Sequence, residues 1–413
     1  MSRGNVTVIG AGMVGICCAS YLQRARYQVT VIDPLAPGSA CSFGNAGVIA
    51  PGACLPLAMP GLWRQVPGFL LDPLGPLSIR WRDLAGSLPW LMDWLRTSSP
   101  ARARQISAAM RSLHRPAFDC LEPLLRDAGA ADFITRAGQL YVSSHRDTVL
   151  GSPLAVELLR EAGVRTEHLG PDEVRQLEPT LAGVRSGLLF PDNGHSKNSY
   201  RVVQRLAEHF VQRGGTVVPD AVKGFDIASD DVTTVIGACG IYPAGTSVVA
   251  AGAWSDRLAG QLGTKVRMIA ERGYHVTAAD SGEMPNRVIS HVDHRIAITP
   301  MDIGVRIGGT VEIADVDAPP NFARAKKLLE IGRAVLPGAR LDNVTEWMGP
   351  RPSVPDGLPV IDRSPHLRNV IYAFGHSHYG FMGAAPTGRL VADLVSGETP
   401  FIDAKPFSLA RLS

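Results

Sequence analysis

The sequence carries almost no excess charge of either sign. It has 41 lysines and arginines against 38 aspartates and glutamates, a formal net charge of +3, and its basic residues form no long run. Proteins that bind nucleic acids need a concentrated basic surface, so we expect no nucleic-acid partner. Hydrophobic residues make up 45% of the 413 residues, which is typical of a globular protein long enough for two domains.

Cysteine is scarce, and its spacing does not suit metal binding. None of the six cysteines belongs to a Cys-x-x-Cys pair, so zinc, iron–sulfur and dithiol redox sites are not expected and we predict no metal site. We interpret the adjacent Cys17 and Cys18 as small buried residues of a helix. A reducing cytoplasm fits this pattern.

Long hydrophobic runs are also missing. No apolar stretch reaches the roughly 18 residues that a transmembrane helix needs. The apolar run 5–9 is followed by Gly10, Gly12 and Gly15, which leave pieces too short for the core of a secretion signal. We interpret this run as the first strand of the fold and expect a cytoplasmic protein.

The N-terminal segment contains a complete dinucleotide-binding unit. A β-branched run leads into Gly10-Ala11-Gly12-Met13-Val14-Gly15, a helix is expected to follow to about Arg24, and a second β-branched run ends on Asp33. Together they form the fingerprint of a Rossmann-type fold, in which the helix N-terminus faces the phosphates. Asp33 would accept a hydrogen bond from a ribose 2′-hydroxyl and repel a 2′-phosphate, which disfavours NADP. The unit alone does not choose between NAD and FAD.

The segment that follows favours FAD. Residues 39–47 read Ser-Ala-Cys-Ser-Phe-Gly-Asn-Ala-Gly and resemble the Ser-x-x-Asn-Ala-Gly segment of the D-amino-acid oxidase/dehydrogenase superfamily of FAD enzymes. Within that superfamily the chain looks most like the bacterial D-amino-acid dehydrogenases and glyphosate oxidoreductase. The resemblance runs along nearly the whole chain, through residues 71–80, 271–275, 308–312, 347–352 and 372–376.

The resemblance implies an α/β fold with two domains. A Rossmann-like FAD-binding domain would be assembled from discontinuous pieces, residues 1–50, 150–260 and 345–413. An α+β substrate-binding domain with a mixed or antiparallel sheet would comprise residues 51–149 and 261–344. The flavin would lie between the two.

The resemblance also assigns the cofactor contacts. The strand at 247–255 ends in small residues, which let the backbone approach a ligand closely, while Val222 either meets the adenine ring or is an ordinary core residue. A strand at 370–374, a glycine turn and a helix form a second anion site near the C-terminus. The expected FAD-binding residues are Gly10, Gly12, Met13, Val14, Gly15, Asp33, Ser42, Asn45, Ala46, Gly47, Val222, Ala251, Gly252, Trp254, Gly375, His378, Gly380, Phe381 and Met382.

The FAD should be bound non-covalently. The monomeric sarcosine oxidases of this superfamily attach flavin through a cysteine a few residues before a Pro-Asp pair. Pro355-Asp356 is present here, but the stretch 349–354 contains no cysteine.

Arginine is the preferred partner of an amino-acid carboxylate because it binds in a bidentate, charge-assisted way. Arg351, between two prolines, is the first candidate, with a structural salt bridge as the alternative. Arg306 lies on a strand and either lines the pocket or pairs with Glu312 or another acid; we favour the pairing. Tyr274 and His275 lie on a strand similar to the pocket-facing strand of the family.

Two histidines follow the C-terminal strand. His376 and His378 are too few for a metal site, so they act near the flavin or substrate, or form hydrogen bonds within the turn. The candidate catalytic residues are therefore Arg351, Tyr274, His376 and His378.

These features predict an FAD-dependent amine or D-amino-acid dehydrogenase or oxidase that transfers hydride from the α-carbon to flavin N5. The substrate would be a D-amino acid or a secondary N-substituted amino acid. A cyclic imino acid, such as a hydroxyproline, or an aminophosphonate is the alternative substrate. A non-catalytic flavin-binding electron-transfer subunit is the alternative of another class, and the electron acceptor would be quinone or O2.

Two further stretches are notable. Residues 62–96 hold four of the six tryptophans among arginines, and we hypothesise peripheral contact with the inner face of the membrane; packing over the substrate domain is the favoured alternative. The polar stretch 194–198 is expected to be a solvated turn.

Overall fold

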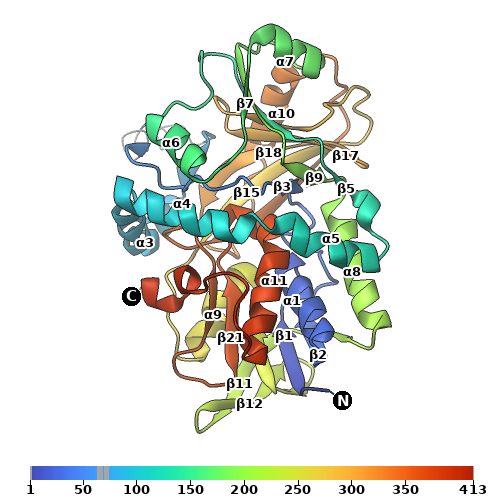
Figure 1. The fold of residues 1–413 in the computed structure, drawn as a ribbon, viewed down its shortest axis with the longest axis vertical. Helices are drawn as coiled ribbons and strands as arrows, with labels where there is room; N and C mark the ends of the chain where they lie inside the picture. Colours follow the sequence, from blue (N-terminus) through green and yellow to red (C-terminus); the bar gives the residue numbers. More distant parts are fainter. Residues whose placement is uncertain (1, 63–67, 69–73, 413) are drawn as a thin grey trace.

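The computed structural model describes residues 2–62, 68 and 74–412 of the chain. A six-stranded sheet with its helices forms the lower half of the molecule in Figure 1, and a nine-stranded sheet forms the upper half. Trp63 of the tryptophan-rich stretch and residues 71–73 of one family-like segment lie outside the described residues.

The six-stranded sheet has the order β10-β2-β1-β14-β21-β20, in which only β20 is antiparallel to its neighbour. β1 and β21 are almost entirely buried, as expected of strands in a parallel sheet covered on both faces. The predicted unit of strand, turn, helix and strand is confirmed as β1, α1 and β2. The bounds are β1 Asn5–Ile9, α1 Met13–Arg24, β2 Gln28–Asp33, β10 Thr216–Pro219, β14 Thr246–Val249, β20 Val360–Arg363 and β21 Val370–Phe374.

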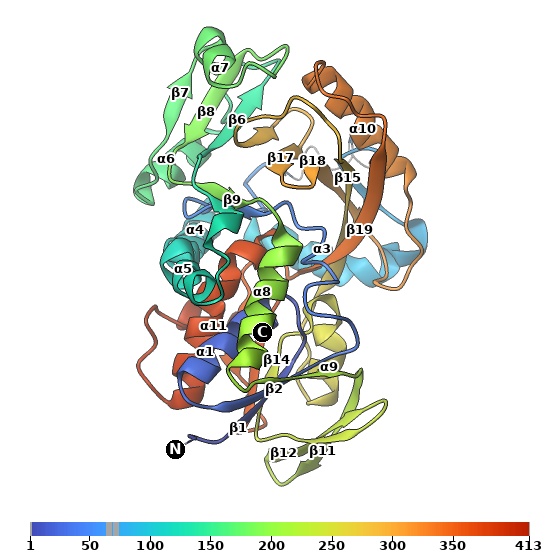
Figure 2. The same ribbon diagram turned by 90° about the vertical axis from the view of Figure 1, so that its right-hand side faces the viewer.

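Helices α1, α8 and α11 cover one face of this sheet, and α4 and α5 pack on α11. Figures 1 and 2 both show α1 beside α11, although the two helices come from opposite ends of the chain. Their contact is close, because a Cβ on Gly388 would lie 2.6 Å from the carbonyl group of Cys17. Cys17 and Cys18 are buried, as predicted. The bounds are α4 Pro100–His114, α5 Ala117–Asp127, α8 Ser199–Gln212 and α11 Gly380–Ser396.

An antiparallel meander and α9 cover the opposite face. Val235 of the meander and Leu258 of α9 belong to one core cluster with Val249 and Phe374 of the sheet. The short 3-10 helix η4 leads into α9. The bounds are β11 Val222–Ala228, β12 Asp231–Gly237, β13 Ile241–Pro243, η4 Gly252–Trp254 and α9 Ser255–Gln261.

The nine-stranded sheet is mixed, as predicted. Its main path runs β19-β15-β18-β17-β16-β6-β8-β7, with β4 paired to β18; the β16–β6 and β18–β4 pairs are parallel and the others antiparallel. Helix α10 packs on β15 and β18 (Figure 2). The bounds are β4 Leu77–Ile79, β6 Gln139–Ser143, α6 Pro153–Glu161, β7 Glu167–Leu169, α7 Pro171–Leu177, β8 Ser186–Phe190, β15 Ile269–Ala278, β16 Val288–His291, β17 Ile296–Met301, β18 Gly304–Ile313, α10 Ala323–Val335 and β19 Val344–Ser353.

The sheets divide the chain differently from the expected boundaries at three places. Strands β7 and β8 fall within residues 150–260, and β19 falls almost completely within residues 345–413, both of which were predicted to form the FAD-binding domain. All three strands belong instead to the nine-stranded sheet. Helices α4 and α5 fall within 51–149, yet they pack against α11. Sequence patterns show that a strand is buried but not which sheet it joins.

The polar stretch 194–198 is not a solvated turn, so this prediction was wrong. It begins with β9 (Gly194–Ser196), which pairs with β3 (Val48–Ile49) and β5 (Ile134–Thr135) in a small sheet. His195 and Ser196 are buried there, because β3 and β5, both distant in sequence, flank β9 on its two sides.

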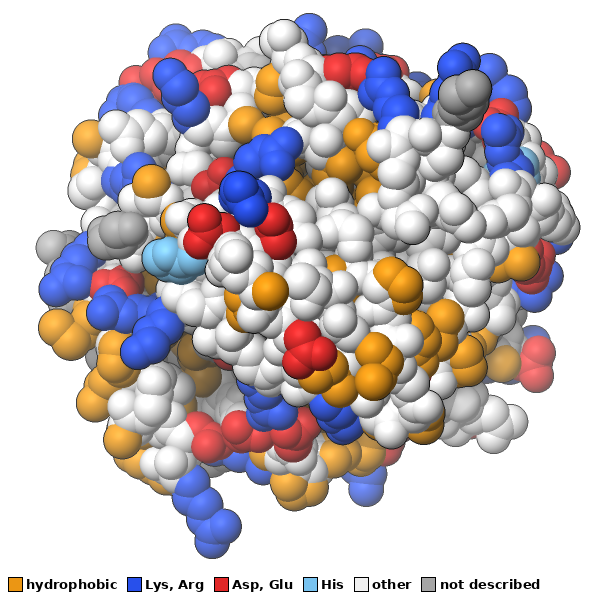
Figure 3. All heavy atoms as spheres, turned by 90° about the horizontal axis from the view of Figure 1, so that it is seen from below, with side chains coloured by type: hydrophobic (Ala, Val, Ile, Leu, Met, Phe, Trp, Pro, Cys, Tyr) orange, Lys and Arg blue, Asp and Glu red, His pale blue; other side chains and the backbone are white. Residues whose placement is uncertain are grey.

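In the described ranges, no helix is long and apolar enough to cross a membrane. Figure 3 views the molecule from below, where basic and acidic side chains alternate over the surface with uncharged groups between them.

The close approach of α1 and α11 generates a prediction for stability. Gly388→Ala would push a methyl group against the backbone of Cys17 and separate the two helices, so we expect a loss of about 1–3 kcal/mol in the free energy of unfolding. The control is Gly86→Ala, in helix α3 (Leu84–Thr97), where no atom lies within 4 Å of the added Cβ. It should leave stability unchanged or raise it by up to about 1 kcal/mol. Urea unfolding of both variants checks this, and equal stability would contradict the proposed role of Gly388.

Candidate functional site

A cavity of about 1680 Å³ is lined by residues from both sheets. It extends from the carboxyl ends of β1 and β2, past η4, to the N-terminus of α11. Ligands commonly bind at the carboxyl ends of parallel strands, where backbone N–H groups and helix dipoles converge. All predicted FAD-binding residues except Gly15, Gly47 and Gly375 line this cavity.

The turn between β1 and α1 has the geometry of a phosphate site. Gly10 has φ +116°, and a Cβ there would lie 2.3 Å from the carbonyl oxygen of Ala250, so this turn requires glycine. Gly12 is the N-cap residue of α1, with no side-chain cap. A Cβ on Gly12 would meet only the Oγ of Ser42, at 3.5 Å, which leaves its other side open to the cavity.

Asp33 lies at the end of β2 beside this turn. Its Oδ2 accepts a hydrogen bond from the N–H of Ala11 at 2.7 Å, and its Oδ1 accepts one from the N–H of Leu35 at 2.8 Å. Burial raises the pKa of Asp33 above its ordinary value. The carboxylate thus holds the glycine turn and borders the cavity.

The loop at 42–47 connects the phosphate turn to the nine-stranded sheet. The N–H of Met13 donates to Ser42 Oγ at 2.9 Å. From the other side, Arg306 donates to the carbonyl oxygens of Phe43 at 3.0 Å and Asn45 at 2.6 Å. Burial lowers the pKa of Arg306 to about 10.

The expected pairing of Arg306 with Glu312 was wrong. Both residues lie on β18, and Glu312 instead pairs with Arg80 and Arg272. The sequence could not show this, because the partners of Arg306 are two carbonyl groups of a loop far away in the chain and the hydroxyl of Thr277 on the neighbouring strand.

The start of β11 and the 3-10 helix η4 also line the cavity. Val222 begins β11, Ala251 and Gly252 enter η4, and Trp254 ends it. No atom lies within 4 Å of a Cβ built on Gly252.

The N-terminus of α11 reaches the opposite end of the cavity. Gly380, Phe381 and Met382 form its first turn, and no side chain caps it. Uncapped N–H groups and the positive end of the helix dipole favour an anion. The two helix N-termini therefore face one cavity and suit the pyrophosphate and the electron-rich ring of FAD, so the residues present fit this cofactor.

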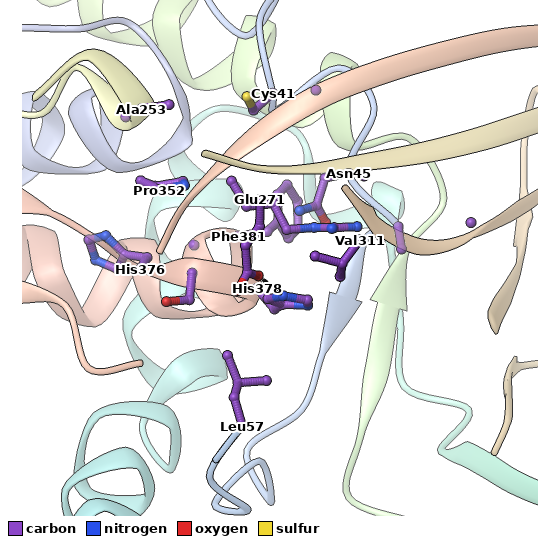
Figure 4. A pocket seen from close by; sticks show the side chains of 18 of the residues that line it. Cys41, Asn45, Leu57, Ala253, Glu271, Val311, Pro352, His376, His378 and Phe381 are labelled. Carbon is purple, nitrogen blue, oxygen red and sulfur yellow. Dashed lines mark hydrogen bonds and ion pairs between the residues drawn. The ribbon is translucent and has the colours of Figure 1, made fainter. Parts of the chain in front are cut away.

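The two candidate histidines have different environments. The Nε2 of His376 lies 2.9 Å from Thr387 Oγ1 within α11, and burial lowers the pKa of His376 to about 3. The Nε2 of His378 lies 2.5 Å from the Oε2 of Glu271. Figure 4 shows His378 next to Glu271 and Phe381, with His376 away from this pair.

Arg351 lies on β19, directly opposite Glu271 of β15. Its guanidinium lies over Gly273, where a Cβ would be 2.0 Å from Nη2, and Nη1 donates to the carbonyl oxygen of Thr310 at 3.4 Å. Among the described residues Arg351 has no carboxylate within ion-pair distance. Burial lowers its pKa, against the charge of Glu271, which raises it.

Tyr274 is among the residues that line the cavity, but its hydroxyl is bound to partners outside this group. Its hydroxyl donates to Glu312 Oε2 at 2.6 Å and accepts from the N–H of Asn321 at 2.9 Å, and the ring belongs to the core behind the sheet. His275 points to the cavity side, stacked on Trp347 with ring centroids 5.0 Å apart. Burial, followed by the charge of Arg306, lowers the pKa of His275 to about 3.

Sequence reasoning missed Glu271. It lies in the family-like segment 271–275, and the alternation of side chains along a strand could have identified it. Glu271, Gly273 and His275 share one face of β15, while Arg272 and Tyr274 share the other. Alternation would have placed Glu271 and Tyr274 on opposite sides of the sheet.

Comparison with known proteins agrees with this geometry. A family model described as DAO, FAD dependent oxidoreductase, matches residues 5–394. A D-amino-acid oxidase of Bradyrhizobium diazoefficiens is 37% identical, and a D-amino acid dehydrogenase of the same organism 31% identical, each over 98% of both chains. A glycine oxidase structure from Bacillus cereus has a TM-score of 0.74 at 19% identity, covering 99% of this chain and 98% of that one.

The open space at Gly12 generates a prediction for cofactor binding. In Gly12→Ala the added methyl group contacts little protein but enters the space of the pyrophosphate. We expect an unchanged free energy of unfolding for the apoprotein and about 10- to 100-fold weaker FAD binding. Flavin absorbance after dialysis against a range of FAD concentrations measures this. Gly260→Ala in α9, which also has open space around its Cβ, is the control that should retain flavin; retention by both variants would contradict the assignment.

Proposed function

Because the chain belongs to the DAO family of FAD-dependent oxidoreductases, we propose that it oxidises a small amino acid at its α-carbon. The substrate is a D-amino acid or an N-substituted secondary amino acid. Relatives covering nearly the whole chain are named D-amino-acid oxidase and D-amino acid dehydrogenase, which supports this substrate class.

The observation that carries the proposal is Arg351. A half-buried guanidinium that lines the cavity without a carboxylate partner among the described residues is suited to a carboxylate ligand. Its position over Gly273, across from Glu271, supports binding of the carboxylate beside Glu271.

Each part of the site then has a role. Bound FAD supplies the two-electron acceptor for the hydride that leaves the α-carbon. Arg351 orients the substrate, the first turn of α11 provides N–H groups for negative charge, and apolar residues such as Leu57, Trp90 and Val311 line the cavity and exclude water. The imine product hydrolyses in water to a keto acid or aldehyde and to ammonia or an amine.

A cyclic imino acid fits the same arrangement, since it also carries one carboxylate and one amine. An aminophosphonate fits less well, because its additional negative charge would meet Glu271. We therefore rank the phosphonate last among the alternative substrates.

We also propose that helix α3 contacts the inner face of a membrane, with a quinone as electron acceptor and O2 as the alternative. Leu88, Met92 and Leu95 are exposed along one side of α3, and Trp81, just before it, is 86% exposed.

The other side of the helix faces the cavity, through residues such as Trp90 and Trp94. Exposed arginines flank the apolar side: Arg82 and Arg96. An apolar stripe with basic ends favours an anionic lipid surface.

The substrate proposal predicts anaerobic bleaching of the bound flavin by D-alanine, D-proline or sarcosine in preference to glyphosate. If no amine bleaches the flavin, the chain is a non-catalytic flavin subunit; if glyphosate alone does, it is an aminophosphonate enzyme.

Arg351→Met should raise KM for the amino acid about 10- to 100-fold, since a charge-assisted hydrogen bond contributes about 1.5–3 kcal/mol. Arg351→Lys keeps the positive charge but loses the planar, bidentate guanidinium. Its KM should lie between the values of the unaltered enzyme and of Arg351→Met. Arg160→Met, an exposed residue of α6, should match the unaltered enzyme. An unchanged KM in Arg351→Met would contradict the role of Arg351.

The membrane proposal predicts that the protein floats with anionic phospholipid vesicles at low salt. The double variant Leu88→Glu and Met92→Glu should lose at least about tenfold in vesicle affinity, because each buried apolar side chain contributes about 1.5–3 kcal/mol. Ile241→Glu, at an exposed position on β13, should float normally. If the unaltered protein remains in the soluble fraction, there is no membrane contact.

A further inference from the structure

Glu271 is a buried carboxylate that the mechanism above does not use. Its residue is 8% exposed, it lines the cavity, and its Oε2 accepts from His378 at 2.5 Å. Burial by itself would raise the pKa of Glu271, but the charges of His378 and Arg351 outweigh it and hold the pKa below its ordinary value. Glu271 is therefore ionised at neutral pH.

Glu271 and Arg351 form a matched pair of opposite charges. They are direct cross-strand partners on β15 and β19, an arrangement that places two Cβ atoms about 5 Å apart on the same face of a sheet. An α-amino acid carries its carboxylate and its ammonium group on one carbon atom. Neighbouring side chains of opposite charge are thus spaced to bind both groups at once.

We propose that Glu271 binds the amino group of the substrate and selects amino acids over hydroxy acids and over anions with two negative charges. The proposal deepens the proposed function and rests on it. Arg351 binds the carboxylate in any of these ligands, so selection between them falls to Glu271. His378 acts as a positioning residue, because its N–H fixes one carboxylate oxygen.

This arrangement has a consequence for pH dependence. Oxidation requires a free lone pair on the substrate nitrogen, whereas the negative charge of Glu271 stabilises the ammonium form and raises the pKa of the bound amine. The rate should therefore rise with pH as that proton leaves. The other titratable groups around Glu271 are His378 and Tyr379 before α11, Arg351 on β19 and His275 on its own strand.

The first test is a binding measurement on the FAD-loaded enzyme. 2-Aminoisobutyrate has no α-hydrogen and cannot be oxidised, and isobutyrate is the same molecule without the amine. We expect the enzyme to bind 2-aminoisobutyrate about 10- to 100-fold more tightly, as seen by calorimetry or by perturbation of flavin absorbance. Glu271→Gln should reduce this ratio to near one, while Glu346→Gln, an exposed residue of β19, should keep it.

The second test separates KM from kcat. With an oxidisable amino acid, Glu271→Gln should raise KM, leave kcat at high pH unchanged, and shift the rise of kcat to lower pH, because the bound ammonium has lost its stabilising charge. A structural role for Glu271 would not move this profile.

The outcomes distinguish the two proposals. If no amino acid reduces the flavin of the unaltered enzyme, the proposed function fails. If amino acids reduce it but the unaltered enzyme binds 2-aminoisobutyrate no better than isobutyrate, the role of Glu271 is overturned, even where Glu271→Gln does not fold. An unchanged ratio and pH profile in Glu271→Gln would also overturn it.

Discussion

Helices α1 and α11 lie in direct contact because Gly388 has no side chain to hold them apart. The first helix of the chain and the last long one are thereby fixed side by side on one sheet (Figure 1). The N-termini of both helices line the same cavity, so the pyrophosphate and the ring of a bound FAD would each meet a positive helix dipole. The spacing between these two helix N-termini depends on this contact.

The charges in the cavity are divided between backbone and side chains. In the proposed arrangement, helix N-termini and the glycine turn provide N–H groups for the cofactor, whereas the substrate end relies on two side chains, Arg351 and Glu271, presented by neighbouring strands. Side chains on rigid strands are well suited to distinguishing one substrate from another, because the sheet sets the spacing between them. Arg306 contributes differently, because it binds carbonyl groups of the loop at 42–47, which connects the glycine turn to the nine-stranded sheet.

The sequence predicted the features that local pattern determines. The unit from β1 to β2, the strand and helix around residue 380, the mixed second sheet and the cofactor class all follow from short segments with a recognisable order. It did not predict which sheet β7, β8 and β19 join, or that Arg306 binds backbone, because these depend on pairing between distant segments. Glu271 was missed for a different reason. Tyr274 was predicted as the catalytic residue of this strand, although alternation along β15 places Glu271 and Tyr274 on opposite faces.

The order of the strands in the six-stranded sheet has a consequence for biosynthesis. β1 leaves the ribosome with only β2 beside it, and its other neighbour, β14, follows more than two hundred residues later in the sequence. β21 and α11 emerge later still. The nascent chain therefore carries a buried-type apolar strand with one unpaired edge through most of translation, a state that exposes it to aggregation and to chaperone binding.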